Sequence, residues 1–343
     1  MTGQPIISVD GLSVTYRSGS SDVRAVQDIA LQIMPGEALG IVGESGSGKS
    51  TVGLSLMQLL PRTAQVEGSI TVDGVDMTAA DRHAARVRGG VIGLVYQDAL
   101  AALNPFRRVG PQIAEVMTHH LGYDQSKAAR ESIEALARVG ISDAAERYSQ
   151  YPHQFSGGMR QRAAIAMALA AKPKVLLADE PTTALDVTVQ AQIVRLLREM
   201  RSAHNMAMIV ISHDLHVIRE TSDRIAVMYH GRIVETGATR DVLADPQHPY
   251  TRDLIRSAPT VESPVISFIP GTPPSPSTSF DGCSFEPRCS VGRGDTKCRT
   301  ERPRLRVVPC HSASQAACHY PLCEASGRSN PPDTHHQPEG KVA

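Results

Sequence analysis

The feature that most constrains the fold is a glycine-rich stretch, which runs from Gly43 to Ser50 and reads Gly-Glu-Ser-Gly-Ser-Gly-Lys-Ser. It follows an apolar run, residues 38–42, which predicts a buried strand, and it precedes a predicted helix over about residues 49–60. A strand, a glycine loop and a helix N-terminus together place backbone N–H groups around an anion. The stretch fits the phosphate-binding pattern G-x-x-x-x-G-K-[ST]. The sequence therefore predicts an α/β fold that binds the phosphates of a nucleotide.

The residue types of this loop suit a nucleoside triphosphate. Its glycines permit a tight backbone path that points successive N–H groups at phosphate oxygens. Lys49 brings a positive charge to the β and γ phosphates, and the Ser50 hydroxyl is a ligand for Mg²⁺. A chance glycine-rich loop is the alternative, and the strand and helix on either side disfavour it. We expect nucleotide contacts from Gly43, Ser45, Gly46, Gly48, Lys49, Ser50 and Thr51.

Two adjacent carboxylates end a second apolar run. Residues 175–178 predict a buried strand, and Asp179 and Glu180 follow it directly. The carboxyl ends of strands form the ligand-binding edge of an open α/β sheet. At that edge Asp179 would hold Mg²⁺, directly or through water, and Glu180 would polarise the attacking water as a general base. In isolation these residues also fit an acidic N-cap of the next helix, but the upstream loop favours the catalytic interpretation.

Composition narrows the class of protein further. The chain has 343 residues, with 35 basic and 35 acidic side chains. This length suggests two domains or one large one, and the balanced charge argues against a protein that mainly binds nucleic acid. No apolar run approaches the ~18 residues of a membrane helix, and the N-terminus lacks a signal-peptide pattern. We expect a soluble cytoplasmic protein, for which docking on a membrane partner stays open.

The order of the predicted elements favours alternating strands and helices before the C-terminal third. Two short strands, residues 6–9 and 12–16, are predicted on either side of an Asp10-Gly11 turn. Residues from about 98 to 172 have a mostly helical pattern. The amphipathic stretch over residues 187–200 lies between two apolar runs of strand length, which is typical of a parallel β–α–β crossover.

The C-terminal third differs in composition. A Pro- and Ser-rich segment, about residues 257–279, indicates a linker or extended arm. All six cysteines lie in the last 61 residues, and clustered cysteines in a cytosolic chain more often ligate metal than form disulfides. We therefore divide the chain into a domain over residues 1–255, an extension over 256–325 and a disordered tail over 326–343.

A further motif carries a resemblance to a known family. Residues 155–162 read Phe-Ser-Gly-Gly-Met-Arg-Gln-Arg. Together with the phosphate-binding loop they resemble the signature motif of ATP-binding cassette (ABC) ATPases, where Leu and Gln are usual in place of Phe155 and Met159. That variation is similar to the peptide-importer branch. Other residues match family motifs in the expected order: Tyr16, Gln97, Asp186 within Ala184-Leu185-Asp186, and His213.

The resemblance implies an α/β fold of a particular kind. It is a P-loop ABC ATPase core, with a RecA-like mixed sheet and an antiparallel β subdomain, a helical subdomain over about residues 98–172, and a small C-terminal cysteine-rich metal module. The resemblance covers roughly residues 6–240.

The resemblance also implies roles for single residues. Tyr16 stacks on adenine, His213 contacts the γ-phosphate, and Gln97 senses that phosphate beside the membrane-subunit interface. The Ser-Gly-Gly turn of the signature motif, which consists of Ser156, Gly157 and Gly158, acts on the ATP held by a second subunit, and Asp186 of the D-loop belongs to the implied nucleotide-binding residues. The implied ligands of Mg²⁺ are Ser50, Gln97 and Asp179. Because no catalytic position is degenerate, we expect ATP hydrolysis, with Glu180, His213 and Lys49 as catalytic residues.

Motifs beyond residue 240 resemble the oligopeptide and dipeptide importer branch. His248-Pro249-Tyr250-Thr251, the Pro-rich run over residues 270–276 and the stretch around Cys283 and Cys289 carry this similarity. Read without the family, they are structural straps along the ATPase core. They identify the branch and are not chemistry themselves.

Relatives in that branch carry a [4Fe–4S] cluster, and the resemblance implies the same group here. Its ligands would be Cys283, Cys289, Cys298 and Cys318. Zinc is the alternative, because four cysteines suit either metal, although the absence of Cys-x-x-Cys spacing favours the cluster. We expect Cys310 and Cys323 to be free thiols, either of which could replace Cys318, and a disulfide is disfavoured in a cytosolic protein.

The resemblance implies a subunit that couples hydrolysis of Mg-ATP to uptake of di- and oligopeptides. Its implied partners are a second ABC ATPase subunit, commonly a paralogue, two transmembrane permease subunits and an extracytoplasmic substrate-binding protein, with no nucleic acid. It would lie peripherally on the cytoplasmic face of the inner or plasma membrane. Nickel complexes and glutathione stay open as substrates. Two other functions also stay open: a soluble cassette ATPase acting on nucleic acid or ribosomes, and an ATPase regulated by a redox-sensing iron–sulfur module.

Overall fold

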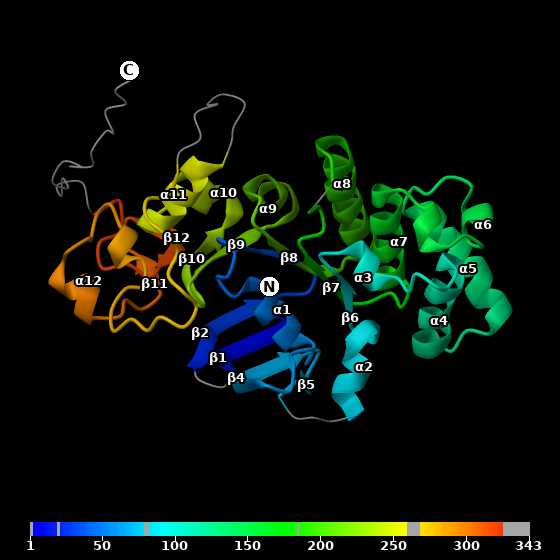
Figure 1. The fold of residues 1–343 in the computed structure, drawn as a ribbon, viewed down its shortest axis with the longest axis horizontal. Coiled ribbons are helices and arrows are strands. Elements are labelled where there is room, and N and C mark those ends of the chain that lie inside the picture. The colour runs from blue at the N-terminus through cyan, green and yellow to red at the C-terminus, as the bar shows by residue number, and fades with distance from the viewer. Residues whose placement is uncertain (1–2, 19–20, 79–81, 184, 259–267, 325–343) are drawn as a thin grey trace, which may run out of the picture.

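The computed structural model describes residues 3–18, 21–78, 82–183, 185–258 and 268–324 (Figure 1). The predicted disordered tail over residues 326–343 lies outside these ranges, and so does Ala184 of the D-loop motif. Part of the predicted linker, residues 259–267, lies outside them as well.

An eight-stranded sheet forms the centre of the molecule (Figure 1), and its strand order is β11-β12-β10-β9-β3-β8-β7-β6. The five strands from β9 to β6 pair in parallel, whereas β10, β12 and β11 pair antiparallel. The sheet is therefore mixed, as predicted. The bounds of its strands are β3 (Ala38–Val42), β6 (Ile92–Val95), β7 (Val175–Asp179), β8 (Ala207–Ser212), β9 (Arg224–Tyr229), β10 (Arg232–Ala238), β11 (Arg306–Val308) and β12 (His311–Ala316).

The predicted β–α–β crossover is confirmed, because β7 and β8 pair in parallel and α8 (Val187–His204) connects them. Alternate residues of β7 belong to two hydrophobic clusters: Leu176 and Ala178 to one, Val175 and Leu177 to the other. The first cluster includes side chains of α8 and α9 (Leu215–Thr221), and the second includes those of α1 (Lys49–Leu56). Because both faces are covered, these strands read as continuous apolar runs rather than alternating ones.

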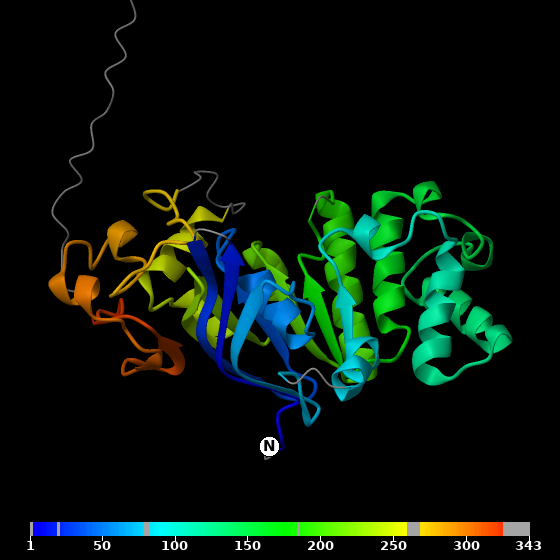
Figure 2. The ribbon, with the colours of Figure 1, turned by 60° about the horizontal axis from the view of Figure 1, so that its bottom comes forward.

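A four-stranded antiparallel sheet, in the order β2-β1-β4-β5, lies beside α1 (Figure 2). Its strands are β1 (Ile7–Ser18), β2 (Ser21–Ile33), β4 (Ala64–Val72) and β5 (Val75–Asp76), and α2 (Arg82–Gly90) follows them. The turn predicted at Asp10-Gly11 is wrong. Gly11 instead lies in a bulge of β1 at φ 62°, where the register shifts against both neighbouring strands. A bulge keeps one strand running where the sequence pattern suggested two.

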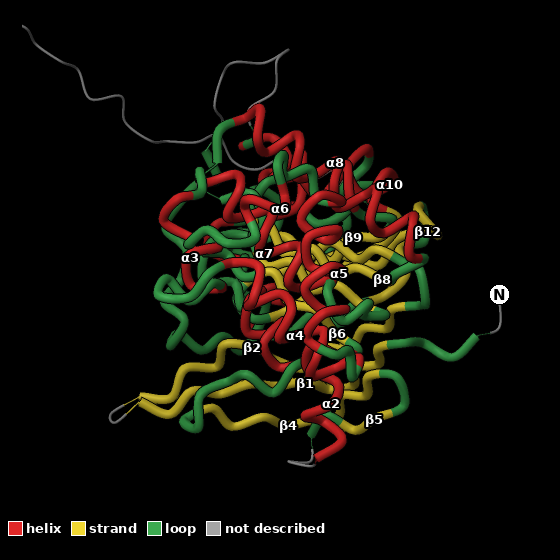
Figure 3. The backbone as a smooth tube through the Cα atoms, turned by 90° about the vertical axis from the view of Figure 1, so that its right-hand side faces the viewer, coloured by secondary structure: helices red, strands yellow, loops and turns green. Residues whose placement is uncertain are grey.

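The stretch predicted to be helical forms a separate lobe. It contains α3 (Ala99–Ala102), α4 (Val109–Leu121), α5 (Gln125–Arg138), α6 (Ala144–Arg147), the 3₁₀ turn η1 (Pro152–Gln154) and α7 (Gly157–Leu169). Figure 3 looks onto this lobe, with α4 and α5 toward the viewer and the antiparallel sheet below. Within the ranges described above, no helix is long and apolar enough to cross a membrane.

The C-terminal extension packs onto the central sheet. α10 (Thr239–Ala244) and α11 (Pro249–Ser257) lead into it, and η2 (Glu286–Arg288) and α12 (Thr296–Thr300) precede the last two strands. β12 pairs with β10, so the extension continues the central sheet. Phe285 is fully buried, with its ring centroid 5.2 Å from that of Tyr229 and 5.3 Å from that of Tyr250. An apolar contact therefore anchors the extension to strand β9 and helix α11.

Candidate active site

The glycine-rich loop connects β3 to α1, as the sequence predicts. Gly48 precedes the helix at φ 99°, a conformation that side-chain-bearing residues rarely adopt. A Cβ atom placed there would come within 2.3 Å of the Ala25 carbonyl oxygen. The loop therefore runs against β2 so closely that only glycine fits, and the helix N-terminus stays open toward an anion.

Lys49 is held inside this loop. Its side chain is buried, and its Nζ donates hydrogen bonds to the carbonyl oxygens of Gly43 at 2.8 Å and Glu44 at 3.0 Å. Burial lowers the pKa of Lys49, while the nearby carboxylates of Glu180, Asp179 and Glu44 act in the opposite direction. The amine is thus fixed at the loop with two backbone acceptors, in the position from which it would reach bound phosphates.

Ser50 and Asp179 meet across 129 residues of sequence. The Ser50 hydroxyl donates to Asp179 Oδ1 at 3.1 Å. Burial raises the pKa of Asp179, and the hydrogen bond from Ser50 partly offsets this. A hydroxyl and a carboxylate side by side are oxygen donors of the kind that Mg²⁺ prefers. This donor set fits the predicted magnesium ligands Ser50 and Asp179.

The Glu180 carboxylate lies within hydrogen-bond distance of three polar side chains, two of which belong to the predicted site. Its Oε2 accepts hydrogen bonds from Gln97 Nε2 at 3.0 Å and Thr183 Oγ1 at 2.8 Å, and its Oε1 lies 3.2 Å from His213 Nδ1. Gln97 thus contacts Glu180, and no bond from it to Ser50 or Asp179 is seen among the described residues. Glu180 also has φ 47°, which is unusual for a residue with a side chain. Strain of this kind concentrates at functional sites.

Ser50, Gln97 and Glu180 line a hollow with a volume of about 340 Å³, within the usual range of small-molecule sites. Asp179 and His213 are not among the residues that line it, although each contacts one that does. Tyr16 lies on its wall, and the Tyr16 hydroxyl is 3.3 Å from Thr51 Oγ1. Other predicted residues that line it are Ser45, Gly46, Gly48, Lys49, Ser50, Gln97 and Glu180. The sequence reasoning missed Arg24, His230 and Pro276, which also line the hollow. Pro276 belongs to the Pro-rich run that the sequence marked only as a sign of the branch.

The signature and D-loop residues lie elsewhere. Ser156, Gly157, Gly158 and Asp186 are not among the residues that line the hollow. The Ser156 hydroxyl accepts a hydrogen bond from the Met159 N–H and caps α7, and Asp186 caps α8 by accepting from the Val189 N–H. Gly158 lies against Val189, since an added Cβ would come within 2.8 Å of its side chain. One chain therefore brings these two motifs together, away from its own phosphate loop.

The four cysteines of the predicted metal set line one small pocket together. Cys289, Cys298 and Cys318 are buried, and Cys283 is half-buried. Burial raises the pKa of Cys283 to about 11 and that of Cys298 to about 12. In the part of the chain that the structure describes, no group of three or more His, Cys, Asp or Glu side chains is arranged closely enough to hold a metal ion.

The prediction that Cys310 and Cys323 are free thiols is wrong. The structure joins them in a disulfide, with Cα atoms 6.5 Å apart. Residues near Cys323 are tethered to Gln247: the Cys323 N–H donates to its side-chain oxygen at 3.2 Å and the Leu322 N–H to its carbonyl at 3.0 Å. These contacts bring Cys323 to the turn between β11 and β12 that contains Cys310. The two cysteines are thirteen residues apart in the sequence, and this spacing alone did not predict that they are close in space.

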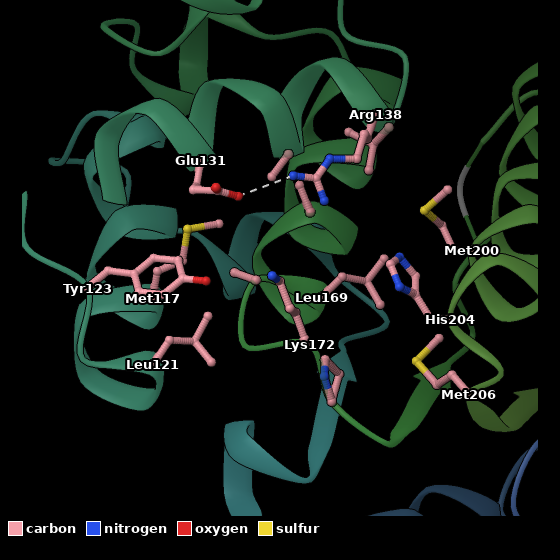
Figure 4. A pocket seen from close by; sticks show the side chains of 15 residues that line it. Met117, Leu121, Tyr123, Glu131, Arg138, Leu169, Lys172, Met200, His204 and Met206 are labelled. Atoms are coloured by element: carbon pink, nitrogen blue, oxygen red, sulfur yellow. Dashed lines mark ion pairs between the residues drawn. The ribbon is translucent and has the colours of Figure 1, made fainter. Parts of the chain in front are cut away.

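A second cavity, of about 160 Å³, lies between the helical lobe and the core (Figure 4). Met117, Leu121 and Tyr123 face Met200 and Met206 across it, and Glu131 pairs with Arg138 at 3.5 Å on its border. It shares no lining residue with the hollow around Lys49.

Comparisons with known proteins agree with this geometry. The profile of the family "ABC transporter" matches residues 26–183. Among solved structures, the dimeric ATP-binding cassette MJ0796, in a post-hydrolysis state bound to ADP and Pi, is similar with a TM-score of 0.61 and 28% identity, covering 68% of this chain and 99% of that one. The fold and the site together define an ATP-binding cassette ATPase.

The C-terminal part narrows the family. The profile "Oligopeptide/dipeptide transporter, C-terminal region" matches residues 234–298. A putative peptide import ATP-binding protein of Brucella abortus is 43% identical, covering 92% of this chain and 97% of the relative. The oligopeptide transport ATP-binding protein OppD of Salmonella typhimurium is 45% identical, covering 83% and 86%. The chain belongs to the ABC transporter ATP-binding proteins that carry this oligopeptide/dipeptide transporter C-terminal region.

Proposed function

We propose that this chain hydrolyses Mg-ATP to drive the import of di- and oligopeptides through separate membrane subunits. The observation that carries the proposal is the meeting of Glu180 with Gln97 and His213 beside the loop that holds Lys49. The peptide-import function printed for the relatives from Brucella and Salmonella supports the substrate class. In this proposal residues 1–255 are the ATPase domain and residues 256–325 the extension.

The mechanism follows from the side chains around the hollow. The loop N–H groups and Lys49 bind the β and γ phosphates of ATP, and Tyr16 stacks on the adenine. Ser50, Asp179 and Gln97 would hold Mg²⁺, which would supply positive charge against that of the phosphates. Glu180 takes the proton of the attacking water through Oε1 or Oε2, and His213 beside it contacts the γ-phosphate.

A second ATPase subunit completes the site. Ser156, Gly157 and Gly158 do not line the hollow of their own chain, so the N-terminus of α7 is available to the ATP of a partner. Val187, next to Asp186, is 83% exposed, which suits an interface between cassettes. We propose that ATP is bound between the loop of one subunit and the Ser-Gly-Gly turn of the other.

The membrane subunits dock near Gln97. Tyr96 is 42% exposed and Phe106 is 89% exposed, and both lie on the stretch that leads from β6 into the helical lobe. Aromatic side chains are enriched at protein–protein interfaces. Because Gln97 also touches Glu180, movement of this stretch reaches the hydrolytic centre directly. The partners in this proposal are two permease subunits on the cytoplasmic side of the membrane and an extracytoplasmic substrate-binding protein.

We also propose that Cys283, Cys289, Cys298 and Cys318 hold a [4Fe–4S] cluster, with zinc as the alternative. Support comes from the four thiols lining one pocket and from the donor set, which suits either metal. Binding requires the sulfurs to move closer together and to lose their protons. Iron and zinc content after purification without oxygen decides between the two metals. A purified chain that contains neither iron nor zinc would contradict both.

Transport itself tests the main proposal. The chain is assembled with its permease subunits in vesicles, and uptake of a labelled oligopeptide is measured with ATP inside. Lys49→Ala in this chain, with the partner ATPase also disabled, should abolish uptake. Co-purification with nucleic acid in a salt-sensitive manner, and without membrane proteins, would favour the soluble cassette instead.

A further inference from the structure

The C-terminal extension contacts the phosphate-binding loop at one residue of the loop, Glu44. Arg288 donates from Nη1 to Glu44 Oε2 at 2.7 Å and from Nη2 to Glu44 Oε1 at 3.1 Å. The side chain of Arg288 is only 5% exposed. A bidentate pair between guanidinium and carboxylate is geometrically specific and stronger than a neutral hydrogen bond. The contact joins residues 244 positions apart in the sequence.

The backbone of Glu44 is held by helix α11, against which Phe285 of the extension packs. The Glu44 N–H donates to the hydroxyl of Tyr250 at 2.9 Å, and Tyr250 is fully buried. Arg288 also donates to the Tyr229 hydroxyl at 3.3 Å. On the other side, the Glu44 carbonyl accepts from Lys49 Nζ. Glu44 therefore contacts both Arg288 of the extension and Lys49, the residue proposed to bind the phosphates.

Arg288 holds a second part of the ATP pocket as well. Its Nε donates to the Pro270 carbonyl at 2.8 Å, at the start of the Pro-rich arm. Further along this arm Pro276 lines the hollow around Lys49, and His230 Nε2 lies 2.9 Å from the Thr278 carbonyl oxygen. One guanidinium thus bonds both the loop under the phosphates and the arm on the pocket wall.

We propose that the C-terminal extension is a structural part of the ATP site and that Arg288 is its positioning residue. Arg288 neutralises the Glu44 carboxylate beside the phosphates and fixes the carbonyl that orients Lys49. It also places Pro276 against the pocket. Because Cys289 is the next residue, the folded state of the cysteine-bearing segment is transmitted to nucleotide affinity through this pair. The inference rests on the nucleotide site proposed above.

Nucleotide binding to the full-length chain tests it, with fluorescent mant-ATP and Mg²⁺ as the probe. Arg288→Ala should raise the dissociation constant about tenfold or more, because it leaves the Glu44 carboxylate unpaired near the phosphates. Arg288→Lys keeps the positive charge and loses the bidentate geometry of the guanidinium. Its dissociation constant should lie between those of the wild type and Arg288→Ala. In steady-state ATPase assays the KM for ATP should rise more than kcat falls.

A double variant separates this role from a merely structural one. Glu44→Gln removes the unpaired charge, so Glu44→Gln with Arg288→Ala should bind mant-ATP more tightly than Arg288→Ala alone. Damage to the fold of the extension would not be rescued in this way. The matched control is Arg299→Ala: Arg299 also neighbours a cysteine of the set and pairs with a glutamate, Glu286, at 3.2 Å, and that glutamate belongs to the extension and not to the loop. It should bind as the wild type does.

The outcomes are distinct. The inference is overturned if Arg288→Ala binds mant-ATP with wild-type affinity, or if the single and double variants lose the same amount of affinity. If Arg288→Ala does not fold, the same comparison is made with Arg288→Lys. Lys49→Ala is measured in parallel. Failure of the wild type to bind mant-ATP would count against the nucleotide site itself, whereas binding that Lys49→Ala abolishes and Arg288 variants leave unchanged would count against the inference alone.

Discussion

Glu180→Gln is the sharpest test of how this site hydrolyses ATP. The carboxylate accepts from Gln97 and Thr183 on one oxygen and faces His213 on the other. A glutamine of the same shape retains these contacts when its oxygen accepts from Gln97 and Thr183 and its amide nitrogen faces His213 Nδ1. The substitution therefore removes the proton acceptor and the charge while the packing stays the same.

The size of the effect follows from this geometry. General-base catalysis contributes about 10²–10⁴ in rate, or about 2.7–5.4 kcal/mol of barrier. Hydrolysis at saturating ATP should fall by that factor. Affinity for ATP should hold or increase, because one negative charge next to Lys49 and the phosphates is lost. The free energy of unfolding should stay within about 0.5 kcal/mol of the wild-type value.

Single-turnover hydrolysis of labelled ATP measures the chemical step, and mant-ATP titration measures binding. Glu220→Gln is the matched control, since Glu220 is an exposed carboxylate that pairs with Arg198 at 2.9 Å on the surface. The assignment of Glu180 as the base fails if Glu180→Gln hydrolyses ATP at the same rate as Glu220→Gln.

Three further variants test other parts of the structure. Phe285→Ala should lower the free energy of unfolding of the region by about 3–5 kcal/mol, because a fully buried ring leaves a cavity, whereas Phe268→Ala, at an 81% exposed ring, should change little in the same denaturant titration. Ser50→Ala should raise the Mg²⁺ concentration needed for half-maximal hydrolysis, and an unchanged requirement would remove Ser50 from the ligand set. Cys289→Ser should lose bound metal and Cys310→Ser should retain it, as metal analysis of both proteins shows; equal loss would contradict the proposed four-cysteine set.

Much of the site was predictable because its residues act through local geometry. A glycine loop between a strand and a helix is a local pattern within eight residues, so the place of Lys49 and Ser50 at the start of α1 could be predicted from the sequence. The pairing of Asp179 with Ser50 also followed, because carboxyl ends of parallel strands meet at one edge. The bulge at Gly11 was not predictable in this way, since a bulge and a turn share the same Asp-Gly signal.

The sequence by itself determined the phosphate loop, the acidic pair and the order of strands and helices around them, because spacing along the chain decides such features. Only the tertiary structure decided that Arg288 and Tyr250 hold Glu44, that Pro276 reaches the ATP pocket and that Cys310 meets Cys323. Apart from the disulfide, these contacts span some two hundred residues or more, and a short motif carries no information about which distant surface it will face. The close packing of the extension on β9 and β10 makes that choice.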